Sequence, residues 1–182
     1  MNSATRICIV AASAAIPALA SLPHAFSYGG KPFSAVSAEG RVVADDARLT
    51  KTVHEWTSPD GKLLLRSTET AYKNFPVKEY LPELVCLWDG PTDIVDGFRS
   101  VSLSRTASGA VLRALRGTVN TDKDFEPVTV AFGRAGATNS DALVATEGRS
   151  SAQRMPWMVV DFPEGDGVEI AVGWSGAWRA DC

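Results

Sequence analysis

Hydrophobic and polar residues alternate along much of the chain, which is the pattern of half-buried β-strands. In residues 62–72, Leu63 and Leu65 fall on one period-2 set, and Arg66 and Thr68 fall on the other. This alternation favours a strand over a helix, because a helix repeats its apolar positions every three to four residues.

Turn-forming residues separate the alternating segments. The sequence Ser-Pro-Asp-Gly at residues 58–61 supplies a proline that presets φ and a glycine that tolerates positive φ, so it predicts a hairpin. Further β-rich segments, each bounded by Gly, Pro, Asn or Asp, lie at 77–88, 98–105, 110–119, 127–132, 142–146, 157–162 and 168–174. About nine short strands without a helical period predict an all-β protein, an antiparallel β-sandwich.

The amino terminus has the features of a secretory signal peptide. Arg6 precedes an uncharged stretch at residues 7–19, and Ala18 and Ala20 place small residues at positions −3 and −1 before Ser21. The stretch is shorter than the roughly 20 residues that a membrane helix needs. We expect cleavage after Ala20, a periplasmic or secreted mature protein, and no membrane attachment after cleavage. A retained anchor is the alternative.

The mature chain is expected to hold one folded domain. Residues 21–48, rich in Ser, Gly and Ala, are interpreted as a leading arm or an edge strand, and residues 49–182 as the β-sandwich domain. No internal repeat or linker divides this region. A chain of this length buries enough surface for a full core without a metal or several disulfides.

Composition and charge narrow the function classes. The chain is 45% hydrophobic and 21% charged, as in ordinary folded domains, and its net charge of −3 argues against a general nucleic-acid binder. Loss of Arg6 with the signal peptide lowers that charge to −4. The 182 residues fall short of the roughly 200 or more of a (β/α)8 barrel, which excludes barrel enzymes unless the remainder lies on another chain.

Two cysteines, Cys86 and Cys182, follow the signal peptide. In an oxidising compartment they could pair. Cys86 lies in the apolar stretch 84–88, so a buried free thiol is an equally good interpretation.

Candidate catalytic chemistry is sparse. A serine triad needs a histidine, and of the two available His24 is expected in a flexible leader and His54 at the surface or edge of a strand. The sequence has no His-Glu-x-x-His motif and no paired-cysteine motif, so we expect neither a metal nor a cofactor. The acidic residues Asp122, Asp124 and Glu126 could bind Ca²⁺, but a solvated turn is the favoured interpretation, and no glycosidase-type carboxylate pair can be selected from the sequence.

Three of the five tryptophans, Trp157, Trp174 and Trp178, fall within residues 157–182. An indole offers a flat apolar face for a sugar ring and an N–H for a hydroxyl group. Core packing is the alternative, and the apolar flanks of Trp157 and Trp174 favour it. Trp178 lies beyond Gly176, where a surface position is as well supported as a core position.

Several motifs occur in the order seen in one enzyme family. They are the stretch FSYGGKPFSA at 26–35, AYKNFPVKEY at 71–80, DFEP at 124–127, and the carboxyl-terminal segment 147–180 with its Met-Pro-Trp and Gly-Trp-Ser-Gly-Ala-Trp sequences. Together they resemble the amino-terminal β-sandwich of melibiase-type α-galactosidases over about residues 26–180. The matching positions are Lys31, Tyr72, Phe75, Pro76, Pro156, Trp174, Gly176 and Trp178.

The resemblance implies a supersandwich-like fold and a role in carbohydrate metabolism. In that family the catalytic aspartates lie in a following (β/α)8 barrel, so the resemblance implies an accessory domain of a truncated or split glycosidase, or an independently used module, without catalytic residues of its own. Trp174 and Trp178, with Trp157, are the expected contacts for galactosides or for a barrel partner. A secreted structural or protein-interaction sandwich without sugar binding is the alternative.

Overall fold

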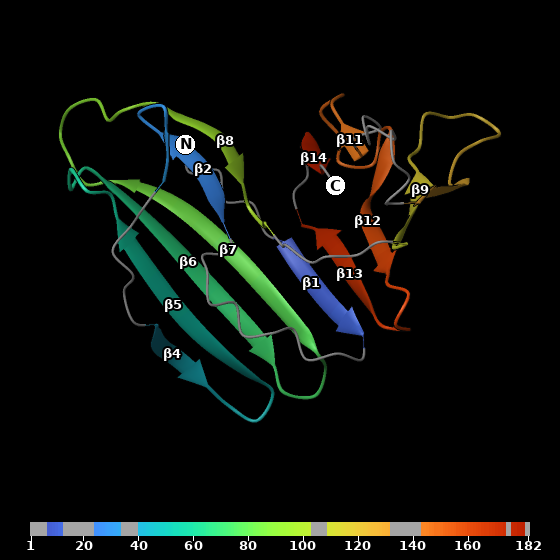
Figure 1. Cartoon of the computed structure of the whole chain (residues 1–182), viewed down its shortest axis with the longest axis horizontal. Helices are drawn as coiled ribbons and strands as arrows, with labels where there is room; N and C mark the ends of the chain where they lie inside the picture. The colour runs from blue at the N-terminus through green and yellow to red at the C-terminus, as the bar shows by residue number, and fades with distance from the viewer. Residues whose placement is uncertain are drawn as a thin grey trace. The chain divides into compact units, whose positions relative to one another are not determined.

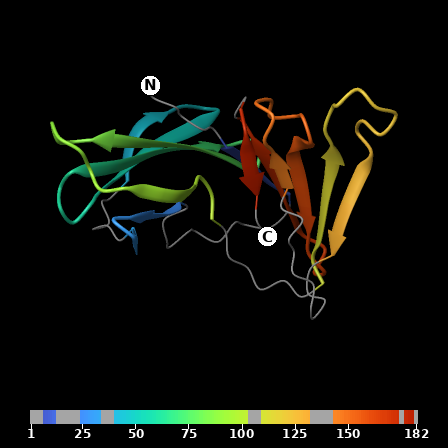
Figure 2. The same cartoon turned by 90° about the horizontal axis from the view of Figure 1, so that it is seen from above.

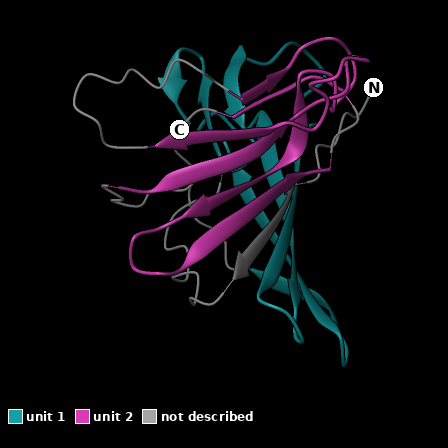
Figure 3. Cartoon of the chain, turned by 90° about the vertical axis from the view of Figure 1, so that its right-hand side faces the viewer, with its two compact units in different colours: residues 1–7, 16–104 teal, residues 8–15, 105–182 magenta. Residues whose placement is uncertain are grey.

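All regular elements in the described part of the chain are β-strands. The structure, a computed structural model, describes residues 7–12, 24–33, 40–102, 109–131, 143–173 and 176–180. The chain forms two compact units, residues 1–7 with 16–104 and residues 8–15 with 105–182 (Figure 3). In each unit, antiparallel strands form two layers around the unit's own core, so the predicted all-β sandwich fold is confirmed.

The larger sheet of unit 1 follows the chain order. Its strands β4 (Arg41–Asp45), β5 (Leu49–Thr57), β6 (Leu63–Tyr72) and β7 (Val77–Cys86) pair with their sequence neighbours (Figure 1). The predicted hairpin joins β5 to β6. Gly61, at a φ of 73°, donates its N–H to the carbonyl oxygen of Ser58 at 2.9 Å, as the turn requires.

A second, smaller sheet covers the larger one in unit 1. It has the order β3 (Lys31–Pro32), β2 (Ala25–Tyr28), β8 (Val95–Arg99), and Figure 2 shows the blue β2 and yellow-green β8 as a separate layer. The core between the layers contains Phe26, Trp56, Leu63 and Leu65. Residues 25–28, in the region interpreted as a leading arm or an edge strand, thus form the central strand of this sheet.

Unit 2 repeats the two-layer principle with other strands. Its larger sheet has the order β10 (Pro127–Ala131), β9 (Val111–Arg116), β12 (Arg154–Asp161), β13 (Gly167–Val172). Its smaller sheet pairs β11 (Leu143–Ala145) with β14 (Trp178–Ala180). Leu112, Ala114, Leu143 and Met158 form the core between these two sheets.

The segment interpreted as a signal peptide contains strand β1 (Ile7–Ala12). A chain cleaved after Ala20 lacks this strand, and cleavage itself stays a prediction. No helix that could cross a lipid bilayer occurs among the residues that the structure describes.

Two expectations about single residues are wrong. Cys86 is exposed at the end of β7, where its thiol donates to the carbonyl oxygen of Trp88 at 3.0 Å, so it is not a buried thiol. Cys182, its possible partner, lies outside the described residues. His24 does not lie in a flexible leader, because its side chain is buried in unit 1 with 4% of its surface exposed.

Candidate functional site

The outer face of the larger sheet in unit 2 exposes one of the predicted contact residues, Trp157. Side chains alternate along β12, and Met158 and Val160 pack into the core. Trp157 therefore points away from the core and keeps 39% of its surface exposed. The expectation that its apolar flanks bury it is wrong, because those flanks occupy the opposite face of the strand.

A carboxylate on the neighbouring strand fixes the indole of Trp157. The indole Nε1–H donates to Oε1 of Glu169 in β13. Glu169 is the register partner of Val159, two residues along β12 from Trp157 and on the same face. The hydrogen bond orients the ring, so that a flat apolar surface lies beside a carboxylate that accepts hydrogen bonds.

An ion pair extends the same face toward β9. Arg113 is the register partner of Val159, and its Nε lies 2.6 Å from Oδ2 of Asp161. Both side chains are partly exposed, so the pair contributes little to stability. The guanidinium group of Arg113 and the carboxylate group of Asp161 nevertheless place charged hydrogen-bonding atoms on the same face as Trp157 and Val159.

A pocket of about 360 Å³ lies at the end of the hairpin that joins β12 to β13. The turn is closed by the N–H of Gly165, which donates to the carbonyl oxygen of Phe162 at 3.1 Å. Three carboxylates contribute to the lining, from Asp161, Asp166 and Glu169. The volume is at the lower end of the range of small-molecule sites, and carboxylates of this kind accept hydrogen bonds from hydroxyl groups.

Of the other two predicted contact residues, Trp178 does not join this face. Trp178 packs against the core of unit 2, and its Nε1–H donates to the carbonyl oxygen of Ser150 at 2.6 Å. Both observations favour a structural role for Trp178 and place its ring on the core side, opposite Trp157. Trp174 lies outside the described residues.

Unit 1 contains a histidine–serine pair that the sequence did not indicate. His24 Nδ1 lies 2.5 Å from the carbonyl oxygen of Ser100, and Nε2 lies 2.7 Å from Oγ of Ser67. Because a carbonyl oxygen only accepts hydrogen bonds, Nδ1 carries the proton in the neutral ring and Nε2 accepts a hydrogen bond from the hydroxyl group of Ser67. Burial lowers the pKa of His24, and the charge of His54 contributes in the same direction.

This pair lacks access to a substrate. Ser67 exposes 1% of its surface, and the rings of Trp56, Tyr80 and Phe98 surround His24 at centroid distances of 6.2–6.5 Å. A nucleophile must reach the reacting atom, so we assign His24 and Ser67 to the core rather than to catalysis.

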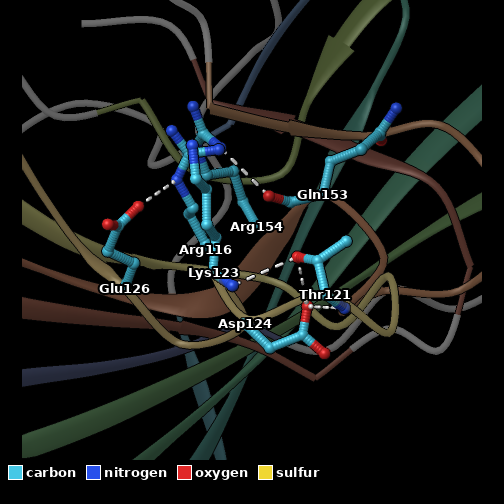
Figure 4. Close-up of polar contacts among 7 residues, drawn as sticks. All are labelled: Arg116, Thr121, Lys123, Asp124, Glu126, Gln153 and Arg154. Carbon is cyan, nitrogen blue, oxygen red and sulfur yellow. Dashed lines mark hydrogen bonds and ion pairs between the residues drawn. The ribbon is translucent and has the colours of Figure 1, made fainter.

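Two of the acidic residues after β9, Asp124 and Glu126, interact with other groups of the protein. Asp124 accepts backbone N–H bonds from Val119 at 3.0 Å and Asn120 at 3.1 Å, which help to lower the pKa of its carboxyl group. Glu126 forms an ion pair with Arg116 (Figure 4). No group of three His, Cys, Asp or Glu side chains within the described ranges is arranged to hold a metal ion.

Comparison with protein-family models, curated proteins and solved structures finds no match to this chain. The resemblance to the amino-terminal sandwich of melibiase-type α-galactosidases therefore remains an expectation based on the sequence motifs.

Proposed function

We propose that this protein is a non-catalytic accessory domain of carbohydrate metabolism, and that it binds galactosides on the outer face of β12 and β13. The observation that carries the proposal is Trp157, which is partly exposed and held by Glu169 beside a pocket whose lining includes three carboxylates. The family resemblance of the sequence motifs supplies the sugar class.

The chemistry of this face suits a neutral sugar. One side of a galactose ring is a patch of C–H groups, which can stack on the indole of Trp157. The hydroxyl groups on the ring edge can donate to Glu169 and Asp161, both within the pocket lining. A single indole contributes about 1 kcal/mol beyond burial, so affinity in the millimolar range is expected.

The binding test uses the N–H signal of the Trp157 indole. We would titrate galactose, melibiose and raffinose into isotope-labelled protein and assign the signal by its loss in Trp157→Phe. The expected result is a saturable shift of this signal, with binding weakened at least several-fold in Trp157→Ala. Trp88→Ala is the matched control, because Trp88 is also exposed but lies in unit 1. Absence of a shift with all three sugars, or equal weakening in the control, would refute the proposal.

A second candidate function is docking to a protein partner, such as a (β/α)8 glycosidase barrel. Leu84, Leu87 and Trp88 expose apolar surface near the end of β7 in unit 1. Exposed apolar surface of this kind often marks an interface. Under this function Trp88→Ala weakens the complex with the barrel, whereas Trp157→Ala leaves it unchanged, so the same two variants separate the two functions.

A further inference from the structure

Two arginines face each other across neighbouring strands in unit 2. Arg116 ends β9, Arg154 begins β12, and the two are direct partners in the antiparallel register. Directly opposite residues have Cβ atoms about 4.5–5.5 Å apart, and like charges in such positions repel each other. A pair of this kind needs negative charge nearby.

The carboxylates of the region meet this need only in part. Nε of Arg116 lies 3.0 Å from Oε2 of Glu126 (Figure 4). Asp124, on the same loop, is instead engaged by the backbone N–H groups of residues 119–121. No ion pair joins Arg154 to a carboxylate of the described residues, so the two arginines and Glu126 together carry a net positive charge.

The guanidinium of Arg154 has a donor without an acceptor. Its Nη1 donates to the carbonyl oxygen of Gln153 at 3.0 Å. Its Nε is buried and has no hydrogen-bond partner among the described residues. Buried donors are nearly always paired in proteins, so this atom indicates an acceptor that the described residues do not supply.

We propose that Arg116 and Arg154 together bind an oxyanion, a group such as a sulfate, a phosphate or the carboxylate of an acidic sugar. The Nε–H and Nη–H groups of a guanidinium form a fork that matches two oxygens of such an anion. Arg154 offers the buried Nε–H, and Arg116 offers its Nη groups while its Nε stays on Glu126. This site goes beyond the proposed function, because it uses other residues and does not require galactoside binding.

The test compares oxyanions with chloride at equal ionic strength. Sodium sulfate, sodium phosphate and sodium glucuronate are titrated separately, with calorimetry for affinity and the thermal midpoint as a second measurement. Saturable binding of glucuronate alone identifies a carboxylate ligand, and binding of sulfate or phosphate alone identifies a tetrahedral one. The proposal is overturned if none of the three binds more strongly than chloride.

Variants connect any binding to these two residues. Arg154→Gln and Arg116→Gln are expected to weaken oxyanion binding about tenfold or more, as loss of a charge-assisted pair implies. Arg66→Gln is the matched control, because Arg66 in unit 1 also pairs with a carboxylate, that of Glu55, at similar exposure. Equal weakening in the control would show that the binding is nonspecific.

A further variant keeps the proposal testable if Arg154→Gln does not fold. Glu126→Gln removes the carboxylate that competes for Arg116, and Glu126 is half exposed. Oxyanion binding should become severalfold tighter in this variant. Unchanged or weaker binding in folded Glu126→Gln would contradict the assignment, because a purely structural arginine pair gains nothing from losing its carboxylate.

Discussion

Protonation of His24 should make the stability of unit 1 depend on pH. Its neutral ring accepts a hydrogen bond from the Ser67 hydroxyl group at Nε2 and is surrounded by aromatic side chains, so the charged form is disfavoured. Burial lowers the pKa of His24 from its ordinary value of 6.5. In the unfolded chain the ring takes up a proton near pH 6.5, whereas in the folded chain it does so only at lower pH.

The sign and size of the effect follow from proton linkage. Above pH 6.5 both states are neutral at His24 and the stabilisation is fully present. As the pH falls below 6.5, the unfolded state binds one more proton than the folded state. The free energy of unfolding then decreases by up to about 1.4 kcal/mol per pH unit, until the pH reaches the lowered pKa of the folded protein.

Urea unfolding at a series of pH values between 7.5 and about 5 measures this slope, in a window above the range in which most carboxyl groups titrate. His24→Gln removes the titrating ring and should remove the slope attributable to this residue. His54→Gln is the matched control, because the His54 ring stacks on Trp56, which the His24 ring meets edge-on, and His54 is not part of the Ser67 hydrogen bond. A slope that persists in His24→Gln, or that disappears only in His54→Gln, would refute the reasoning.

Three further predictions concern the core, the hairpin and the amino terminus. Leu65→Ala removes a fully buried side chain from the core of unit 1 and should lower the free energy of unfolding by about 2–5 kcal/mol, measured by urea denaturation. Gly61→Ala forces a side chain onto a φ of 73° and should cost about 1 kcal/mol although the added Cβ meets no atom within 4 Å, whereas Gly61→Asn should cost less. The exported protein should begin at Ser21 by intact mass, and recovery of the complete chain from the cytosol alone would contradict the signal-peptide prediction.

The alternation of apolar and polar residues predicted which face of a strand is buried only where the other face is polar. In residues 62–72 the alternation of Leu65 with Arg66 indicates both the strand and its orientation, and β6 has that orientation. In residues 157–160 every side chain is apolar, so period-2 alternation cannot show which set faces the core. The pairing of Met158 with Ala114 of β9 places Met158 in the core and leaves Trp157 outside.

Burial of His24 depends on contacts that lie far along the chain. Its two hydrogen-bond partners, Ser67 and Ser100, are 43 and 76 residues away. Around His24 the large side chains of His24, Phe26 and Tyr28 alternate with small residues, but a stretch of five residues does not show by itself that this set is buried. The division into two units could not be predicted from the sequence either, because no Pro- or Gly-rich linker marks the boundary near residue 104.

The two proposed sites in unit 2 differ in charge, and that difference makes them separable by salt. The face around Trp157 has more carboxylates than arginines, and its expected ligand is neutral, so galactoside affinity should change little with ionic strength. In the Arg116–Arg154 pair only Arg116 is ion-paired to Glu126, and the expected ligand of the pair is charged. Salt screens the attraction between partly exposed charges, so oxyanion affinity should fall steadily as sodium chloride is raised from low ionic strength to about 0.15 M, where the screening length is about 8 Å.

Parallel titrations of melibiose and the best oxyanion across that range measure both trends. Equal salt dependence for the two ligands would contradict the assignment of separate sites, because a neutral sugar on the indole face has no net charge for the salt to screen.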